Sequence, residues 1–286
     1  MTRTPPTNLR SLEARLRNLA RAEELAEGRV RRALSVAIVG QLLRHSQAGV
    51  IKGASNLELR LGTASSRASS DLDAVRAVEL DDFRSRLEEA LVTGWQGFTG
   101  RMIDRGEIRA PVPMAYRPHR FHTKLDFQGR PFSTVELEVV SEEVGGLTVS
   151  EFIDLVPVTA AWFDVLGLEA PDPIPVLPLA HQIAQKLHAC TTPDDIGWTN
   201  ERAHGLIDLQ LAVELFAGEL AEIREIAIQL FAARQRQPWP PNITVRAGWA
   251  NRYREEADGL DVVDDVESAA SWVNELIKRI DQDRRG

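Results

Sequence analysis

Val50 to Val75 reads "VIKGASNLELRLGTASSRASSDLDAV", and this stretch decides the expected fold. It predicts a short strand that ends at Lys52, a turn at Gly53-Ala54-Ser55, and a helix that starts at about residue 56. "SSDLDAV" then predicts a second short strand. Together these elements indicate part of a small sheet flanked by helices. The lysine, arginines and aspartates on these elements are the kinds of group that a site for phosphates and a metal ion uses.

The two aspartates of this stretch are the first candidate site residues. Asp71 and Asp73 are two residues apart, so both carboxylates point to one face of the strand and Leu72 points to the other. Carboxylates this close repel each other unless a cation lies between them. Oxygen ligands favour Mg²⁺ or Mn²⁺ over zinc. Solvated surface acids would give the same pattern.

The residues before the helix could bind phosphate. Gly53 and Ser55 stand where backbone N–H groups and a hydroxyl can approach an anion at a helix N-terminus. Lys52, Arg60 and Arg67 add positive charge around them. A tight strand–helix turn without a ligand explains the same residues equally well.

A third carboxylate is expected from a hairpin further along the chain. Two alternating runs flank Gln128-Gly129 in "RFHTKLDFQGRPFSTVELEVV". Glu136 and Glu138 share one face of the second run, and Asp126 in the first run is a rival. Either run could complete a metal site, and an exposed sheet face is the alternative explanation.

Downstream, a buried ion pair is expected. Asp208 shares a mostly apolar face of its predicted helix, so its carboxylate needs a partner, and Lys186 or His204 could supply it. A structural salt bridge is the alternative to a catalytic pair. His181 and His188 lie near one face of their helix without a third ligand, which favours packing or substrate contact over metal binding.

The expected fold class is α+β, a small mixed sheet flanked by helices with a helical C-terminal half. Periodicity predicts helices from Leu9, over Val30–His45, after Asp81 as N-cap, and over Ala180–Cys190, Glu201–Phe216, Glu219–Arg234 and Val266–Ile280. "PDPIPVLP" reads as a connector. The expected division is residues 1–48 as N-terminal helices, 49–170 as the core and 171–286 as a helical region.

Cysteine content, charge distribution and hydropathy exclude some classes of protein. The lone Cys190 excludes an intrachain disulfide framework and a multi-cysteine zinc site. Residues 1–60 carry a balance of +6 and the remainder −14, within a net charge of −8. Such a basic segment can hold polyanions locally, although an amphipathic helix with a solvated arginine face explains it too. No signal core or membrane span is visible, so we expect a cytoplasmic protein without a membrane partner.

Six segments in order resemble the AbiEii/AbiGii-type nucleotidyltransferase toxins, which include the MenT-like toxins of type IV toxin–antitoxin systems. They run from about Leu9 to Tyr253 and include "IKGASNLELRLG", "RASSDLDAV", "FSTVELEVV", "IAQKLHA", "RAHGLIDL" and "LFAARQRQPWPP" with "GWANRY". Three positions depart from the family pattern: Ala54 replaces a second glycine, Glu138 stands where Asp is commoner, and His204-Gly205 replaces Lys-Asp.

The resemblance implies a DNA polymerase β-like nucleotidyltransferase core over residues 49–170. By it, Asp71, Asp73 and Glu138 would hold Mg²⁺ or Mn²⁺ ions, and Asp208 would orient Lys186. The implied nucleotide-binding residues are Lys52, Gly53, Ser55, Arg67 and Lys186.

The implied reaction transfers NMP from an NTP to the 3′ end of tRNA, releases pyrophosphate and blocks translation. The implied partners are the acceptor end of tRNA, an NTP, for which a pyrimidine is favoured, and a cognate antitoxin. Transfer to a protein side chain and a non-catalytic binding protein of the same fold are the alternative interpretations.

Overall fold

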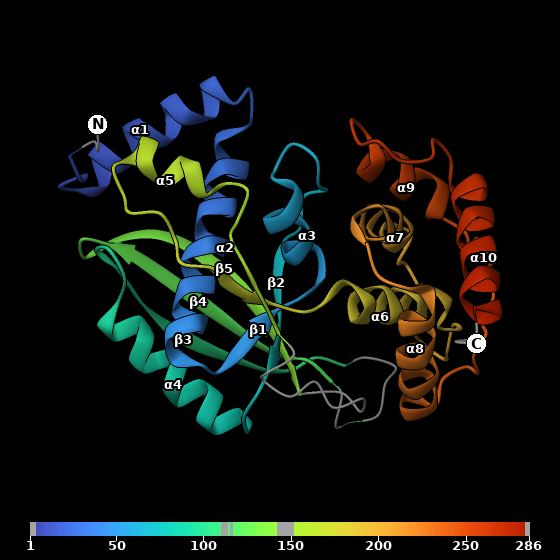
Figure 1. The fold of residues 1–286 in the computed structure, drawn as a ribbon. Coiled ribbons are helices and arrows are strands. Elements are labelled where there is room, and N and C mark those ends of the chain that lie inside the picture. The colour runs from blue at the N-terminus through green and yellow to red at the C-terminus, as the bar shows by residue number, and fades with distance from the viewer. Residues whose placement is uncertain (1–3, 110–113, 115–116, 142–151, 284–286) are drawn as a thin grey trace. The chain divides into compact units, whose positions relative to one another are not determined.

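The computed structural model describes residues 4–109, 114, 117–141 and 152–283, and the chain forms two compact units. The sheet unit comprises most of the chain up to Leu177, and the helical unit begins at Pro178. The sheet has seven strands in the order β3-β4-β5-β2-β1-β7-β6 (Figure 1). Their bounds are β1 Gly49–Ile51, β2 Asp71–Arg76, β3 Phe98–Glu107, β4 His119–Phe127, β5 Arg130–Ser141, β6 Ile153–Leu155 and β7 Ile174–Val176.

Helix α2 (Glu27–Ser46) is the central helix of the sheet unit and lies across one face of the sheet (Figure 1). Most of its residues from Val30 to Leu43 are buried, so it is apolar nearly all round, as a helix enclosed by other elements should be. At Gly40 an added Cβ would lie 2.9 Å from the Ile174 side chain. The glycine therefore lets the helix backbone approach β7 closely.

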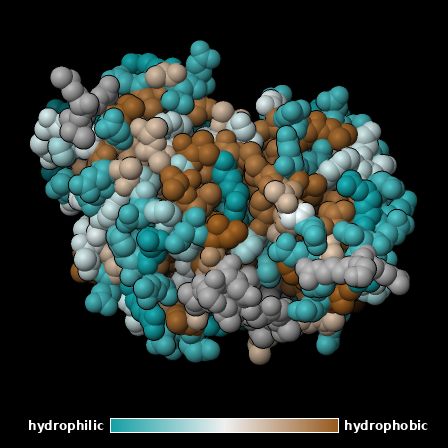
Figure 2. Space-filling model, in the orientation of Figure 1, coloured by the Kyte–Doolittle hydropathy of each residue, from teal (hydrophilic) through white to brown (hydrophobic). Residues whose placement is uncertain are grey.

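Three further helices complete the layer around α2. Helix α1 (Leu9–Ala22) packs on α2 and on α5 (Ala160–Leu166), and α4 (Leu80–Thr93) packs on α2 and β3. Only one side of α4 is buried, through Phe83, Leu87 and Leu91, and hydrophilic residues cover much of its outer side (Figure 2). This amphipathic pattern is what a surface helix over a sheet requires.

Parallel pairing between β2 and β5 sets the centre of the sheet. Leu72 lies opposite Leu137, and both are fully buried in the core beneath the helices. Alternate residues of each strand point to the other face of the sheet, where Val50, Val75 and Val140 form a small separate cluster. One face of the sheet is therefore core, and the opposite face is free to carry polar groups.

A β-bulge adjusts the hairpin of β4 and β5. Gln128 and Gly129 both have positive φ, of 49° and 72°, as a two-residue hairpin turn of this type requires. Asp126 pairs with Pro131 but Leu125 pairs with Ser133, so Phe132 is the extra residue. The shift lets both Phe132 and Val135 point into the core.

The helical unit consists of α6 (Leu179–Thr191), α7 (His204–Leu215), α8 (Leu220–Arg234), α9 (Trp249–Ala257) and α10 (Val266–Gln282). Helix α6 packs on α7 and α8, and α10 contacts α7, α8 and α9. At Gly205 an added Cβ would lie 2.2 Å from the Cys190 sulfur. Gly205, one of the departures from the family pattern, thus allows α7 to pack closely on α6.

The expected α+β fold, the hairpin and the main helices of the C-terminal half are confirmed. Two local expectations are wrong. Gly53-Ala54-Ser55 is not a separate turn, because α3 (Gly53–Leu61) begins at Gly53 itself. Asp81 is not the N-cap of α4, where Glu79 stands; it lies in the first turn, where an acid is favourable toward the helix dipole.

The segment "PDPIPVLP" is more than a connector. Its Ile174–Val176 forms β7, which pairs in parallel with β1 and antiparallel with β6. The compact units change at Leu177 rather than at the expected 170/171 division, and α1 and α2 belong to the sheet unit. No helix in the described part of the chain has the length and apolar character needed to cross a membrane.

Leu137→Ala should destabilise the sheet unit by about 2–5 kcal/mol, because it leaves a cavity beneath the central pair of strands. The matched control is Val92→Ala, since Val92 is 74% exposed on α4 and its loss should change stability by no more than about 0.5 kcal/mol. Urea unfolding followed by circular dichroism measures both. Equal effects of the two substitutions would contradict this placement of the core.

Candidate functional site

Three carboxylates converge on the polar face of the sheet. The β2–β5 register places Asp71 opposite Glu136 and Asp73 opposite Glu138. One carboxylate oxygen from each of Asp71, Asp73 and Glu138 lies within 4.8 Å of the other two, and all three side chains are half-buried. No other three acids, histidines or cysteines in the described residues come together in this way.

The charge balance of this acidic triad favours a bound cation. Burial raises the pKa of Glu138, and repulsion from Asp73 and Asp71 raises it further, against a hydrogen bond and ion pair from Arg120 that lower it. The raised pKa means that one arginine does not offset the burial and repulsion. Clustered oxygen ligands of this kind suit Mg²⁺ or Mn²⁺, so the residues fit the metal that the sequence led us to expect.

Half-buried Arg32 of α2 holds the start of β2 in place. Its guanidinium donates to the carbonyl oxygen of Ser69 at 3.1 Å and to that of Asp71 at 2.6 Å. Burial lowers the pKa of Arg32, while Glu58, Asp71 and Asp73 act to raise it. On the carboxylate itself, Asp71 Oδ1 accepts a hydrogen bond of 2.9 Å from the Ser69 hydroxyl. The first aspartate is therefore fixed through both its backbone and its side chain.

Gly53 packs directly against the second aspartate. It has φ of +68°, and an added Cβ would lie only 2.2 Å from Asp73 Oδ2. The Lys52 backbone N–H donates to the Asp73 carbonyl at 2.9 Å, which ties the beginning of α3 to β2. The N-terminus of α3 thus lies beside the triad, where backbone N–H groups favour an anion.

The other candidate phosphate-binding residues differ in position. Ser55 is 1% exposed, and its hydroxyl donates to the Asp71 carbonyl at 3.4 Å, so it supports β2. Arg67 is half-buried in the segment before β2 and donates to the adjacent Ala68 carbonyl at 3.3 Å. Both lie on the segments that lead to the triad.

The rival acid Asp126 is not brought to the triad. It pairs with Pro131 near the hairpin turn, seven residues along β5 from Glu138, which corresponds to about 23 Å along the strand. Glu136 does lie on the polar face, next to Glu138, but it engages Arg120 at 3.1 Å and His122 at 3.5 Å. Of the three alternatives, Glu138 is the acid that faces both aspartates.

Lys186 and Asp208 form the expected ion pair within the helical unit. Lys186 Nζ lies 2.5 Å from Asp208 Oδ2, and the Asp208 side chain is fully buried while that of Lys186 is 15% exposed. His204, the other proposed partner, instead lies 4.0 Å from Glu256. A buried carboxylate with one charged partner holds that partner firmly, so Asp208 fixes the position of the lysine ammonium.

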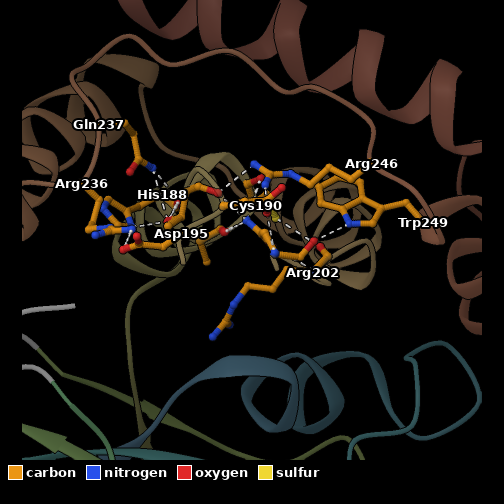
Figure 3. Close-up of polar contacts among 12 residues, drawn as sticks. His188, Cys190, Asp195, Arg202, Arg236, Gln237, Arg246 and Trp249 are labelled. Carbon is orange, nitrogen blue, oxygen red and sulfur yellow. Dashed lines mark hydrogen bonds and ion pairs between the residues drawn. The ribbon is translucent and has the colours of Figure 1, made fainter. Parts of the chain in front are cut away.

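His188 lies at the centre of a polar cluster in the helical unit (Figure 3). Arg234 Nη1 lies 3.2 Å from His188 Nδ1, and because a guanidinium only donates, Nδ1 must be the acceptor of a neutral ring. Burial, followed by the charges of Arg234, Arg202 and Arg236, lowers the pKa of His188 to about 2. His188 is thus a buried, hydrogen-bonded residue of the helical unit.

The loop after α6 is tied to the same cluster. Arg236 lies 2.9 Å from Asp195, Arg246 pairs with Asp194, and Trp249 donates from its ring nitrogen to the Asn200 carbonyl at 2.7 Å (Figure 3). His181, the other histidine of α6, is half-buried. In the part of the chain that the structure describes, neither histidine of α6 joins a metal-binding group.

Sequence reasoning missed two arginines of the site, Arg32 and Arg120. Arg32 stands in "RVRRALS", where helical periodicity would have shown that it shares a side of α2 with buried Ser35 and Val36. Arg120 lies opposite Glu138 in the β4–β5 register. A two-residue turn without a bulge would have placed it opposite Leu137 instead, so only the position of the bulge reveals its role.

A family model described as "Nucleotidyl transferase AbiEii toxin, Type IV TA system" matches residues 41–275. Among solved structures, the chain is similar to the nucleotidyltransferase toxin MenT4 of Mycobacterium tuberculosis H37Rv, with 18% identity, a TM-score of 0.47, and coverage of 90% of this chain and 93% of that one.

It is also similar to ANT(2″)-Ia, solved with adenylyl-2″-tobramycin, at 16% identity and a TM-score of 0.35, over 71% of this chain and 98% of that one. The chain has no significant match among curated proteins.

Gly53→Ala should weaken binding of Mn²⁺ at least about tenfold, because the new methyl group displaces the Asp73 carboxylate, and it should also lower stability by about 1–3 kcal/mol. Gly129→Ala is the matched control: Gly129 also has positive φ, but an added Cβ there meets no atom within 4 Å. Isothermal titration calorimetry compares the two. If both variants bind Mn²⁺ like the parent, Asp73 is not a ligand held by Gly53.

The helical unit should lose stability in acid because His188 stays neutral when folded. Its pKa is about 2 in the folded protein and ordinarily 6.5. The unfolded chain therefore binds a proton that the folded chain does not as pH falls below 6.5, and His188 costs up to about 1.4 kcal/mol per pH unit from there downward. Urea unfolding between about pH 7 and pH 4 measures the slope.

His188→Gln is the control, since a glutamine can accept from Arg234 but does not titrate, and it should show a shallower slope. Should the glutamine variant fail to fold, ¹⁵N chemical shifts of the parent ring decide the matter. They should report a neutral His188 with the proton on Nε2 down to about pH 4. A ring that titrates near 6.5 would contradict the assignment.

Proposed function

The chain belongs to the AbiEii nucleotidyltransferase toxin family of type IV toxin–antitoxin systems, and from this premise we propose that it transfers NMP from an NTP to the 3′ end of tRNA. Pyrophosphate is released, and the modified tRNA no longer supports translation. Membership of the family supports nucleotidyl transfer as the class of reaction. The choice of tRNA as acceptor and the dependence on Mg²⁺ are parts of the proposal.

The observation that carries the proposal is the convergence of Asp71, Asp73 and Glu138 beside the N-terminus of α3. Anionic ligands for a divalent cation on β2 and β5 and backbone N–H groups for a phosphate at the start of α3 are then neighbours. A triphosphate needs both, because it carries several negative charges that must be neutralised before a nucleophile can approach.

In the proposed reaction the terminal 3′-hydroxyl oxygen of the acceptor attacks the α-phosphorus of the NTP in line. The new bond joins that oxygen to the α-phosphorus, the bond from the α-phosphorus to the bridging oxygen breaks, and pyrophosphate leaves with the electron pair. The hydroxyl proton passes to solvent. Bound Mg²⁺ supplies charge neutralisation of the triphosphate and lowers the pKa of the attacking hydroxyl.

The chain's own residues take distinct roles in this proposal. Asp71, Asp73 and Glu138 would hold the metal, and the backbone at Gly53 would receive a phosphate at the start of α3. Lys186, fixed by its 2.5 Å contact with Asp208, would neutralise negative charge on the triphosphate as the bond breaks.

Lys52 and Arg67 would add positive charge around the phosphates. Ser55, whose hydroxyl supports the Asp71 carbonyl, would contribute through its backbone N–H rather than its side chain.

Two features support a nucleic-acid acceptor and a regulated toxin. Residues 1–60 carry a balance of +6, which favours a polyanion near the sheet unit. Family membership implies a cognate antitoxin that restrains the activity. We also expect a pyrimidine nucleotide to be the preferred NTP.

Incubation of the purified protein with each α-³²P-labelled NTP, total tRNA and Mg²⁺ should label tRNA and release pyrophosphate. Asp73→Asn should lower the rate at least about 10²-fold, because a ligand for charge neutralisation in the transition state is lost. The matched control is Asp154→Asn, a side chain that is 62% exposed and pairs with Arg44 in the same unit. This control should keep the parent's rate.

Three outcomes contradict the proposal in different ways. Label that migrates with protein instead of RNA would identify protein side chains as the acceptor. Equal rates for the parent and Asp73→Asn would remove the acidic triad from the chemistry. Absence of any Mg²⁺-dependent NTP binding in calorimetry would identify a non-catalytic binding protein.

A further inference from the structure

Arg120 is the cation closest to the acidic triad in the β4–β5 hairpin. It lies directly opposite Glu138 in the strand register. Its Nη2 is 2.5 Å and its Nε 3.2 Å from the same oxygen, Glu138 Oε1, and its Nε is also 3.1 Å from Glu136 Oε1. One guanidinium therefore bridges the two glutamates of β5 and concentrates two of its hydrogen bonds on a single oxygen of the triad.

Glu138 is also one of the three carboxylates that could bind a divalent cation. Asp71 and Asp73 supply two anionic ligands from β2, and Glu138 is the acid of β5 that faces them. A Mg²⁺ or Mn²⁺ ion would sit about 2.1 Å from its ligand oxygens. A guanidinium and a divalent cation on one carboxylate repel each other, so occupancy by the metal weakens the hold of Arg120 on Glu138.

The side chain of Arg120 is free enough to move. It is 36% exposed, whereas that of Glu138 is 14% exposed. Within the described residues the hydrogen bonds and ion pairs of Arg120 run to Glu138 and Glu136, and Glu136 also has His122 at 3.5 Å. This contrasts with Arg32, whose guanidinium is bound to the backbone carbonyls of Ser69 and Asp71.

We propose that Arg120 is an exchangeable counter-ion of the triad: it pairs with Glu138 when no metal is bound, a divalent cation displaces it, and the released guanidinium binds a phosphate oxygen of the nucleotide. The planar, bidentate guanidinium suits a phosphate as well as a carboxylate, so the same group serves both states. The first half concerns metal binding alone. The second half rests on the proposed function.

A permanent structural role for Arg120 predicts the opposite change in the affinity for metal. An arginine that permanently orients Glu138 would assist metal binding, and its removal would weaken the affinity for metal. An exchangeable counter-ion competes with metal, so its removal should strengthen that affinity. The sign of the change in affinity therefore separates the two roles, and loss of folding alone produces neither a tighter site nor a selective gain from metal.

The first experiment titrates the chelator-treated full-length chain with Mn²⁺ and follows free Mn²⁺ by electron paramagnetic resonance without nucleotide. Arg120→Gln should bind Mn²⁺ about threefold to fivefold more tightly than the parent, the upper part of the range expected for removing a partly exposed ion-pair competitor. Lys124→Gln is the matched control, because Lys124 lies on the same strand and face, opposite Thr134, and it should change the affinity less than about twofold. Asp73→Asn should abolish the binding.

Thermal unfolding gives a second readout. In EDTA, Arg120→Gln should melt at a lower temperature than the parent and Lys124→Gln, because the carboxylates of the triad then repel each other without a counter-ion. Saturating Mn²⁺ should abolish this difference, because the bound cation then supplies the missing positive charge. Unchanged or weaker Mn²⁺ binding by Arg120→Gln, while the parent binds normally, would overturn the proposal.

The second experiment measures binding of a non-hydrolysable NTP analogue with Mn²⁺ present. Arg120→Gln should bind it at least about tenfold more weakly than Lys124→Gln, as expected when one charge-assisted hydrogen bond to phosphate is lost. Equal binding by the two variants would overturn the phosphate role of Arg120. If the parent binds Mn²⁺ but no NTP analogue, the proposed function fails while exchange between metal and Arg120 stands on the first experiment.

Discussion

The parallel register of β2 and β5 is the constraint on which the site depends. It places Asp71 opposite Glu136 and Asp73 opposite Glu138, so four carboxylates project from one face of two adjacent strands. The other face of the same strands is fully buried, which prevents the register from slipping by one residue without exposing the core. The energy of core burial is thereby used to hold like charges together, and those charges then require cations.

Two arginines, one from α2 and one from β4, supply part of this positive charge in different ways. Arg32 approaches from α2 and binds the backbone at the start of β2, so it fixes the position of the first aspartate. Arg120 approaches from β4, is partly exposed, and binds the third acid itself. The raised pKa of Glu138 despite Arg120 indicates that this arginine does not fully offset the burial of Glu138 and the repulsion from Asp73 and Asp71.

Much of the site could be predicted from the sequence because strand alternation is local. Asp71 and Asp73 share a face by spacing alone, and the alternation in "STVELEVV" offers Glu136 and Glu138 as the third acid, with Asp126 of the preceding run as a rival. A carboxylate on an apolar helix face must have a partner, so the sequence predicted one for Asp208 and offered Lys186 or His204, of which the structure shows Lys186.

The rest depends on contacts between distant segments. The role of Arg120 required the bulge at Phe132, whose only trace in the sequence is that apolar Phe132 and Val135 are three residues apart instead of two. The strand at Ile174–Val176 was hidden by its prolines, although a strand at this position is anchored by β1 and needs few hydrogen bonds of its own. Helix α3 begins at Gly53 because its backbone packs against Asp73, a tertiary contact that turn propensity does not contain.

The most direct test of the central claim is an anomalous-difference map from crystals of the protein soaked in Mn²⁺. The account predicts a peak on the polar face of the sheet, about 2.1–2.3 Å from a carboxylate oxygen of each of Asp71, Asp73 and Glu138. Ordered Mn²⁺ bound elsewhere, or a soaked crystal in which these three carboxylates contact no metal, would contradict it.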